Sequence, residues 1–198
     1  MSARPGIRAA QYGFTLAAVL ALGYCAVVWV DARLYQAREA RQFHGETHLK
    51  NRSSPPKVST ALSIPVEGDL VGRLEIPRIG VSVMVVEGTE DGDLKRAVGH
   101  IPGTALPGAS SNVGIAGHRD TFFRPLRSIH RDDAITLRTL QGAFRYRVVS
   151  TKVVRPEDVQ VLYPNGRDTL TLVTCFPFDY VGSAPMRFIV RAERSPQT

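Results

Sequence analysis

A cysteine at the end of a strand-like segment is the residue of this chain best suited to covalent chemistry. Cys175 follows β-branched and aliphatic residues at 169–174, and Asn165-Gly166 before them is a turn signal. A cysteine thiolate attacks acyl carbons and can carry an acyl group as a thioester. A strand-end cysteine is also compatible with a small, inert, buried residue. The neighbours of Cys175 therefore decide between these interpretations.

An arginine on the last strand-like segment is the first such neighbour. If the final two strands form an antiparallel hairpin centred near Val181, Cys175 lies opposite Arg187 and Val173 lies opposite Ile189. A guanidinium beside a thiol stabilises the thiolate, or the oxyanion that forms when the thiolate attacks a carbonyl. Taken alone, Arg187 is better explained as an exposed strand arginine.

A histidine ending another strand is the best candidate for the base that a cysteine nucleophile needs. His118 follows the apolar segment NVGIAG, and a strand end presents an imidazole from a rigid position. An isolated histidine at a strand end is more often structural than catalytic, so this assignment also depends on the residues that lie near His118. His100, at the start of a Gly/Pro-rich loop, is a second possibility, whereas His130 lies in a polar turn and is expected at the surface.

The sequence predicts neither a metal site nor a cofactor. His44 and His48 are four residues apart, but no third ligand lies near them in the sequence. The only other cysteine, Cys25, lies in an apolar segment that we interpret as a membrane span, so no disulfide with Cys175 is expected. Cys175 is therefore predicted to be a free thiol.

The elements that must position these residues are short strands separated by turns. From residue 70 onward the chain alternates β-rich runs with Gly, Pro and Asn turn signals, with short helical segments at 90–98 and 122–129. Seven strands are recognised by pattern, at 71–76, 81–86, 112–117, 134–139, 143–154, 168–175 and 186–192. Their spacing is typical of an antiparallel sandwich or a small barrel.

The N-terminal part has a different texture. Residues 12–30 carry no charge and are long enough to cross about 30 Å of hydrocarbon as a helix. We interpret them as an uncleaved signal anchor, in preference to a cleaved signal peptide or a buried globular helix. Residues 1–11 form a short tail predicted to lie inside the cell, and 31–69 form a linker whose first part has helix-forming composition.

Composition is that of a globular protein with a basic surface. Of 198 residues, 43% are hydrophobic and 22% are charged, and the formal net charge is +7. No basic block or aromatic-interleaved basic stripe stands out, so nucleic acid is not an expected partner. The excess charge instead favours a solvated surface near anionic lipid.

Three motifs and one loop together resemble the corresponding segments of the sortase family. TLVTC (171–175) is similar to the sortase segment that ends at the nucleophilic cysteine, and NVGIAGHRD (112–120) to the segment with the catalytic histidine. RFIV (187–190) is similar to the strand that begins with the catalytic arginine, and HIPGTALPG (100–108) to the loop before the histidine strand. The motifs occur in the family order, and the match runs from residue 70 to about 193. The short chain most resembles class D or similar short sortases.

The resemblance implies an all-β fold, a closed eight-stranded barrel with a few short helices. The catalytic domain would span 70–194, with a tail at 195–198. Cys175 would be the nucleophile, His118 the general acid/base, and Arg187 the oxyanion or substrate-positioning group. Substrate contacts are expected from three further residues, Thr174, His100 and Phe176.

The resemblance also implies a reaction and its partners. The chain would cleave an LPxTG-like sorting signal near the C-terminus of exported proteins through an acyl-thioester. The acyl group would then pass to an amine of a cell-wall precursor or of a protein lysine. The domain would lie outside a bacterial membrane on a single-pass anchor. Two alternatives remain open from the residues: a cysteine endopeptidase that hydrolyses the same bond, and a non-catalytic β-domain that binds a surface ligand.

Overall fold

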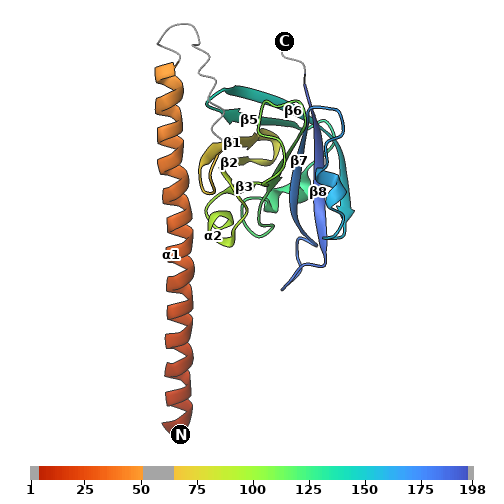
Figure 1. The fold of residues 1–198 in the computed structure, drawn as a ribbon. Helices are drawn as coiled ribbons and strands as arrows, with labels where there is room; N and C mark the ends of the chain where they lie inside the picture. Colours follow the sequence, from red (N-terminus) through yellow and green to blue (C-terminus); the bar gives the residue numbers. More distant parts are fainter. Residues whose placement is uncertain (1–4, 51–64, 196–198) are drawn as a thin grey trace.

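The computed structural model describes residues 5–50 and 65–195 of the chain, and the parts of the predicted linker and tail at 51–64 and 196–198 lie outside these residues. Within the described part, one long helix stands beside a closed β-barrel (Figure 1). The closed eight-stranded barrel and the apolar N-terminal helix confirm the predicted fold class.

The strands in chain order are β1 (Leu70–Ile76), β2 (Val81–Glu87), β3 (Val98–His100), β4 (Asn112–Ala116), β5 (Ala134–Thr139), β6 (Gly142–Val154), β7 (Thr169–Phe176) and β8 (Met186–Arg194). The helical elements are α1 (Pro5–Lys50), α2 (Asp91–Leu94) and the 3-10 turns η1 (Pro77–Ile79), η2 (Arg124–Ser128) and η3 (Val159–Leu162). The sequence pattern missed β3 because three residues are too few to show a period of two. It placed a longer helix where α2 has a single turn.

Around the barrel the strands follow the order β1-β2-β3-β4-β7-β8-β6-β5. The pairs β2–β3 and β4–β7 are parallel, and the other pairs are antiparallel. The antiparallel pairing that the strand spacing suggested is therefore wrong for these two pairs, whereas a small barrel is what the strands form. The β4–β7 pair matters most, because it joins the strand before His118 to the strand that carries Cys175.

The register of the β7–β8 hairpin agrees with the sequence prediction. Cys175 pairs with Arg187, and Val173 pairs with Ile189. Turn signals fix the ends of the two strands, and the alternate residues Leu170 and Leu172, both fully buried in the core, fix which face of β7 points inward. Leu172 faces the core, so its neighbours Val173 and Cys175 belong to the outer side of the barrel wall.

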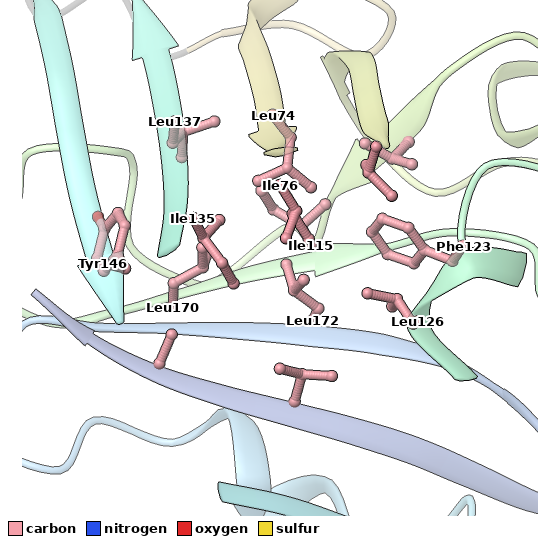
Figure 2. Packing of buried hydrophobic residues seen from close by; sticks show 14 of the residues in the cluster. Leu74, Ile76, Ile115, Phe123, Leu126, Ile135, Leu137, Tyr146, Leu170 and Leu172 are labelled. Carbon is pink, nitrogen blue, oxygen red and sulfur yellow. The ribbon is translucent and has the colours of Figure 1, made fainter. Parts of the chain in front are cut away.

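The core fills the barrel with side chains from most strands and from η2 (Figure 2). Its central members are at most 3% exposed: Leu74, Ile76, Ile115, Phe123, Leu126, Ile135, Leu137, Tyr146, Leu170 and Leu172. Each fully buried aliphatic side chain stabilises the fold by about 1.5–3 kcal/mol. Desolvation raises the pKa of Tyr146 to about 12, so its phenol stays neutral at ordinary pH. The barrel wall is thus a rigid support for groups on its outer face.

Helix α1 extends the predicted span in both directions. Within the described residues, Ala10–Arg41 is the one helical stretch long and apolar enough to cross a membrane. The helix continues to Lys50, so the first part of the predicted linker is helical. The side chains of His44 and His48 lie outside the described residues.

An ion pair connects η1 to the residue before β5 and makes the stability of the fold depend on pH. The Arg78 guanidinium donates to both oxygens of Asp133, at 2.6 Å from Nη2 to Oδ2, and the His130 N–H donates at 2.7 Å. The hydrogen bond from Arg78 lowers the pKa of Asp133 most, and the His130 amide adds to this. A carboxyl with a lowered folded-state pKa stabilises the fold above its unfolded pKa of about 3.9, and that stability is lost as pH falls through the folded pKa.

We therefore expect Asp133→Asn to lower the free energy of unfolding at pH 7 by roughly 2 kcal/mol. The difference from the native chain should shrink below about pH 4, as the native carboxyl also becomes protonated. Urea unfolding followed by circular dichroism across this range measures both effects. Asp132→Asn, at the exposed neighbouring position, is the matched control. Equal loss in both variants, or a difference independent of pH, would contradict the assignment.

Candidate active site

Cys175 and Arg187 lie opposite each other at the end of the β7–β8 hairpin that leads into its connecting loop. They are direct cross-strand partners, and both side chains are partly exposed. The Cys175 thiol is free. One guanidinium nitrogen of Arg187, Nη1, donates to the carbonyls of Ala184 at 3.2 Å and of Met186 at 3.0 Å. These bonds hold the guanidinium at the strand position opposite Cys175, where a cation suits the stabilisation of an attacked carbonyl oxygen.

His118 is brought to the same place by the parallel β4–β7 pair. Ala116 pairs with Val173, and the Gly117 N–H donates to the Val173 carbonyl at 3.1 Å. Continued two residues along both chains, this register carries His118 to the level of Cys175. The register therefore directs the three predicted catalytic residues toward one end of the barrel wall, His118 from the segment after β4 and the other two from β7 and β8. The His118 ring is partly exposed, as a proton-transfer group requires.

Close packing behind His118 explains why a glycine precedes it. A Cβ atom at Gly117 would lie 2.7 Å from the Phe123 ring and 2.9 Å from Val98 Cγ1. Both neighbours belong to the buried core. Any larger residue at Gly117 would push the strand end outward and displace His118 with it.

Thr174 supports the histidine segment from inside the barrel. Its side chain is 2% exposed, and its hydroxyl donates to the Gly117 carbonyl at 2.7 Å. The predicted substrate contact is therefore not made by this side chain, which points inward because it alternates with Cys175 along β7. Its observed role is to join the ends of β4 and β7.

His100 is also internal. Its ring is 2% exposed, with Nδ1 2.7 Å from Glu87 Oε2 and Nε2 2.9 Å from the Ala105 carbonyl. Thr104 Oγ1 lies 3.1 Å from the same Nε2. The expected substrate contact from His100 does not fit this position, because both ring nitrogens are engaged below the surface. The histidine instead connects β2, β3 and the loop that follows β3.

Phe176 belongs to an aromatic cluster beneath the hairpin loop. Its ring centroid is 5.9 Å from that of Phe178 and 6.2 Å from that of Phe188, and the latter two are 5.3 Å apart. Such contacts stabilise by about 0.5–1.5 kcal/mol beyond their buried area. Phe176 remains partly exposed beside Cys175, so a substrate contact stays a prediction for this residue.

Arg119 is a site residue that sequence reasoning missed. It follows His118 directly, yet it is 5% exposed. Its guanidinium donates to the carbonyls of Pro177 at 2.9 Å, Tyr180 at 2.6 Å and Gly182 at 2.9 Å. One buried cation thus holds the loop between β7 and β8. The signal available was the arginine itself beside the candidate histidine, but its partners lie far away in sequence.

We expect Arg119→Met to loosen this loop and lower kcat/KM on a peptide substrate about 10- to 100-fold, because small displacements of positioned groups have effects of this size. Unfolding free energy should fall by about 1–3 kcal/mol through loss of the charged hydrogen bonds. Limited proteolysis of the loop separates the two effects from each other. Arg119→Lys should recover only part of the activity, because a lysine lacks the planar fork.

Arg145→Met, at an exposed position on β6, is the matched control for lost charge. If Arg119→Met lowered stability but left loop cleavage and kcat/KM unchanged, Arg119 would support only the fold.

A groove adjoins the site on the outer face of β6 and β8. It encloses about 290 Å³ and is lined by Ser150, Lys152, Gln160, Val161, Ile189 and Arg191. Ile189 also pairs with Val173, two residues from Cys175 along β7. Arg191 and Asn112 both donate to the Val161 carbonyl, at 2.6 and 3.1 Å, and so fix η3 as a wall of the groove. The lining of the groove is mixed apolar and basic.

Comparisons with known proteins point to one family. The sortase domain family model matches residues 74–195. The chain is 33% identical to sortase D of Bacillus subtilis (strain 168) over 165 residues, 83% of each chain. The structure of a Clostridium perfringens sortase D5 transpeptidase is similar with a TM-score of 0.66 and 26% identity, over 84% of this chain and 99% of that one. The structure of sortase A from Corynebacterium diphtheriae is similar with a TM-score of 0.62 and 30% identity, over 67% of this chain and 64% of that one.

Proposed function

The chain belongs to the sortase family, and from that premise we propose that it is a membrane-anchored cysteine transpeptidase acting on exported proteins with an LPxTG-like C-terminal sorting signal. The proposal is supported mainly by the strand register, which pairs Cys175 with Arg187 and runs the segment that leads to His118 alongside β7. A free, partly exposed thiol beside a cation and level with an imidazole suits acyl transfer.

In the first half-reaction, the Cys175 thiolate attacks the scissile peptide carbonyl and forms a C–S bond. Negative charge develops on the carbonyl oxygen, where the Arg187 guanidinium stabilises it. The C–N bond then breaks as His118 gives a proton to the leaving amine. The products are an acyl-thioester on Cys175 and a released C-terminal segment.

In the second half-reaction, an acceptor amine attacks the thioester carbonyl and transfers a proton to His118. Arg187 stabilises the second oxyanion, and Cys175 leaves as the thiolate. The acceptor is an amine of a cell-wall precursor or of a protein lysine. Water is the competing nucleophile, so shielding of the thioester by the loop that Arg119 holds favours aminolysis over hydrolysis.

The groove beside Ile189 gives the substrate a site next to the thiol. A segment extending from Cys175 past Val173 and Ile189 would reach the groove wall formed by η3. The anchor is α1, and we place the barrel on the outer side of a bacterial membrane, where exported substrates are available.

The test uses peptides with LPxTG-like sequences and mass spectrometry of the intact protein. A covalent peptidyl adduct on Cys175 is the expected result, and with a diamine or an oligoglycine acceptor the product should carry the new amide. An adduct that gives only hydrolysed peptide despite saturating amine would identify an endopeptidase. A folded protein that forms no adduct across a broad peptide panel would overturn the proposal.

A further inference from the structure

Helix α1 contacts the barrel through the first residues beyond the predicted span. Gln36 Nε2 donates to the Arg96 carbonyl at 2.7 Å, and Gln36 Oε1 accepts from the Met84 N–H at 2.9 Å. Met84 and Arg96 lie just ahead of the first β2–β3 pair, Val85 with Val98. The Gln36 amide therefore continues the hydrogen bonding where the two strands separate.

A second contact fixes the same face of the helix. Arg96 Nε lies 2.8 Å from Asp31 Oδ2, one residue beyond the span. The ion pair is half exposed, so its own contribution is about 0–1 kcal/mol. Together with the Gln36 amide it orients α1 against the barrel, as Figure 1 shows for the whole helix. The anchor is thus joined to the barrel directly at these contacts.

This junction sets the height of the barrel above the membrane. With a rise of 1.5 Å per residue, Gln36 lies about 9 Å beyond residue 30. Each headgroup layer of a bilayer is about 5–8 Å thick. Trp29, with Arg33 over its ring at 4.7 Å, marks the interface at the end of the span. The side of the barrel that faces the N-terminal half of α1 must therefore meet the headgroups.

The loop between β7 and β8 lies on that side. In Figure 1 it extends from the barrel toward the level of the middle of α1, whereas the β5–β6 turn lies toward the opposite end of the helix. The loop exposes two large side chains in sequence, Tyr180 at 46% and Val181 at 96%. Single exposed apolar residues are common, but this pair stands at a loop tip that the barrel places next to lipid.

Charges around the loop also suit a lipid surface. Asp179 lies 3.8 Å from Arg124 and 3.7 Å from Arg127, and both arginine side chains are half exposed. Two cations for one carboxylate leave a positive excess beside the loop tip. Arg119 holds the loop carbonyls from behind, so the tip needs little further ordering to enter an interface.

We propose that the β7–β8 loop is a second membrane contact of this protein. Tyr180 and Val181 enter the interface of the bilayer that α1 spans, and Arg124 and Arg127 lie against lipid phosphates. Aromatic residues favour this depth, and nearby arginines are attracted to anionic headgroups. The contact holds the ends of the loop, which carry Cys175 and Arg187, close to the membrane. It does not depend on the chemistry proposed for them.

The test places a tryptophan at the loop tip of the full chain. Val181→Trp in a Trp29→Phe background, which leaves this tryptophan alone in the chain, is reconstituted in vesicles of equal parts phosphatidylglycerol and phosphatidylcholine. We expect the emission maximum of this tryptophan to lie to the blue of that of a tryptophan in water. We also expect lipids brominated near the headgroup to quench it. The native chain, whose only tryptophan is Trp29, gives the reference for interfacial quenching.

Leu140→Trp in the same background is the control, because Leu140 is 39% exposed on the β5–β6 turn and should remain unquenched. Arg96→Asp should weaken the quenching at position 181, and adding Asp31→Arg should restore it. Water-like emission at position 181, or equal quenching at positions 181 and 140, would overturn the proposal. Peptide adduct formation is measured separately and is not expected to decide the outcome.

Discussion

Replacement of Cys175 by alanine is expected to abolish acyl transfer, with a loss of up to about a millionfold in kcat, as found when a nucleophile is removed from an enzyme that works through a covalent intermediate. The reason is that neither half-reaction has another route once the thioester cannot form. The fold should remain intact, because the side chain is partly exposed and loses only sulfur. Product analysis by mass spectrometry measures both cleavage and transfer.

Cys25→Ala is the matched control, since Cys25 is the other cysteine and lies in α1. It should form the peptidyl adduct at the native rate. If Cys175→Ala retained transfer, the domain would use a different nucleophile. If neither the native chain nor any variant acted on peptides, the non-catalytic binding domain would become the better interpretation.

Removal of the Arg187 guanidinium is expected to have the second largest effect. Arg187→Ala should lower kcat by about 10²–10³-fold, the range observed when one oxyanion-stabilising donor is removed. KM should change less, because the guanidinium interacts more strongly with the developing charge than with the ground state. The kcat of Arg187→Lys should fall between those of the native chain and of Arg187→Ala, because lysine keeps the positive charge but lacks the planar fork of the guanidinium.

Arg138→Ala provides the comparison. Arg138 is a half-exposed arginine on β5, and it forms an ion pair with Glu75 on β1. This substitution should leave kcat unchanged. A large increase in KM with constant kcat for Arg187→Ala would assign the residue to substrate binding. Thermal unfolding of both variants shows whether the hairpin itself has been weakened.

The sequence contained enough information for the hairpin but not for the position of His118. Alternation along 169–174 fixes the inward face, and the same alternation places Thr174 inside, which a stricter use of the pattern would have predicted. The parallel pairing of β4 with β7 leaves no local signal, because the two strands are joined through a long connection. From the sequence, only the resemblance of the motifs to the sortase family predicted that His118 and Cys175 belong to one site.

The buried polar contacts were beyond sequence reasoning for a related cause. His100 lies in a strand of three residues, too short for a burial pattern, and its partner Glu87 comes from another strand. Arg119 was invisible because a buried arginine has the same sequence signature as an exposed one. In both cases tertiary partners determine the burial and the hydrogen bonds of the side chain, and propensity and periodicity carry no information about those partners.

The parallel β4–β7 pair also determines when the candidate site residues come together during folding. A chain that emerges N-terminus first carries the His118 segment well before the cysteine strand exists, and the barrel closes only when β7 and β8 enter between β4 and β6. Such non-local pairing raises contact order and makes this a late step of folding. Cys175 therefore comes alongside the His118 segment only once β7 pairs with β4, and opposite Arg187 only once β8 has followed. A partly folded chain holds the cysteine without these two neighbours.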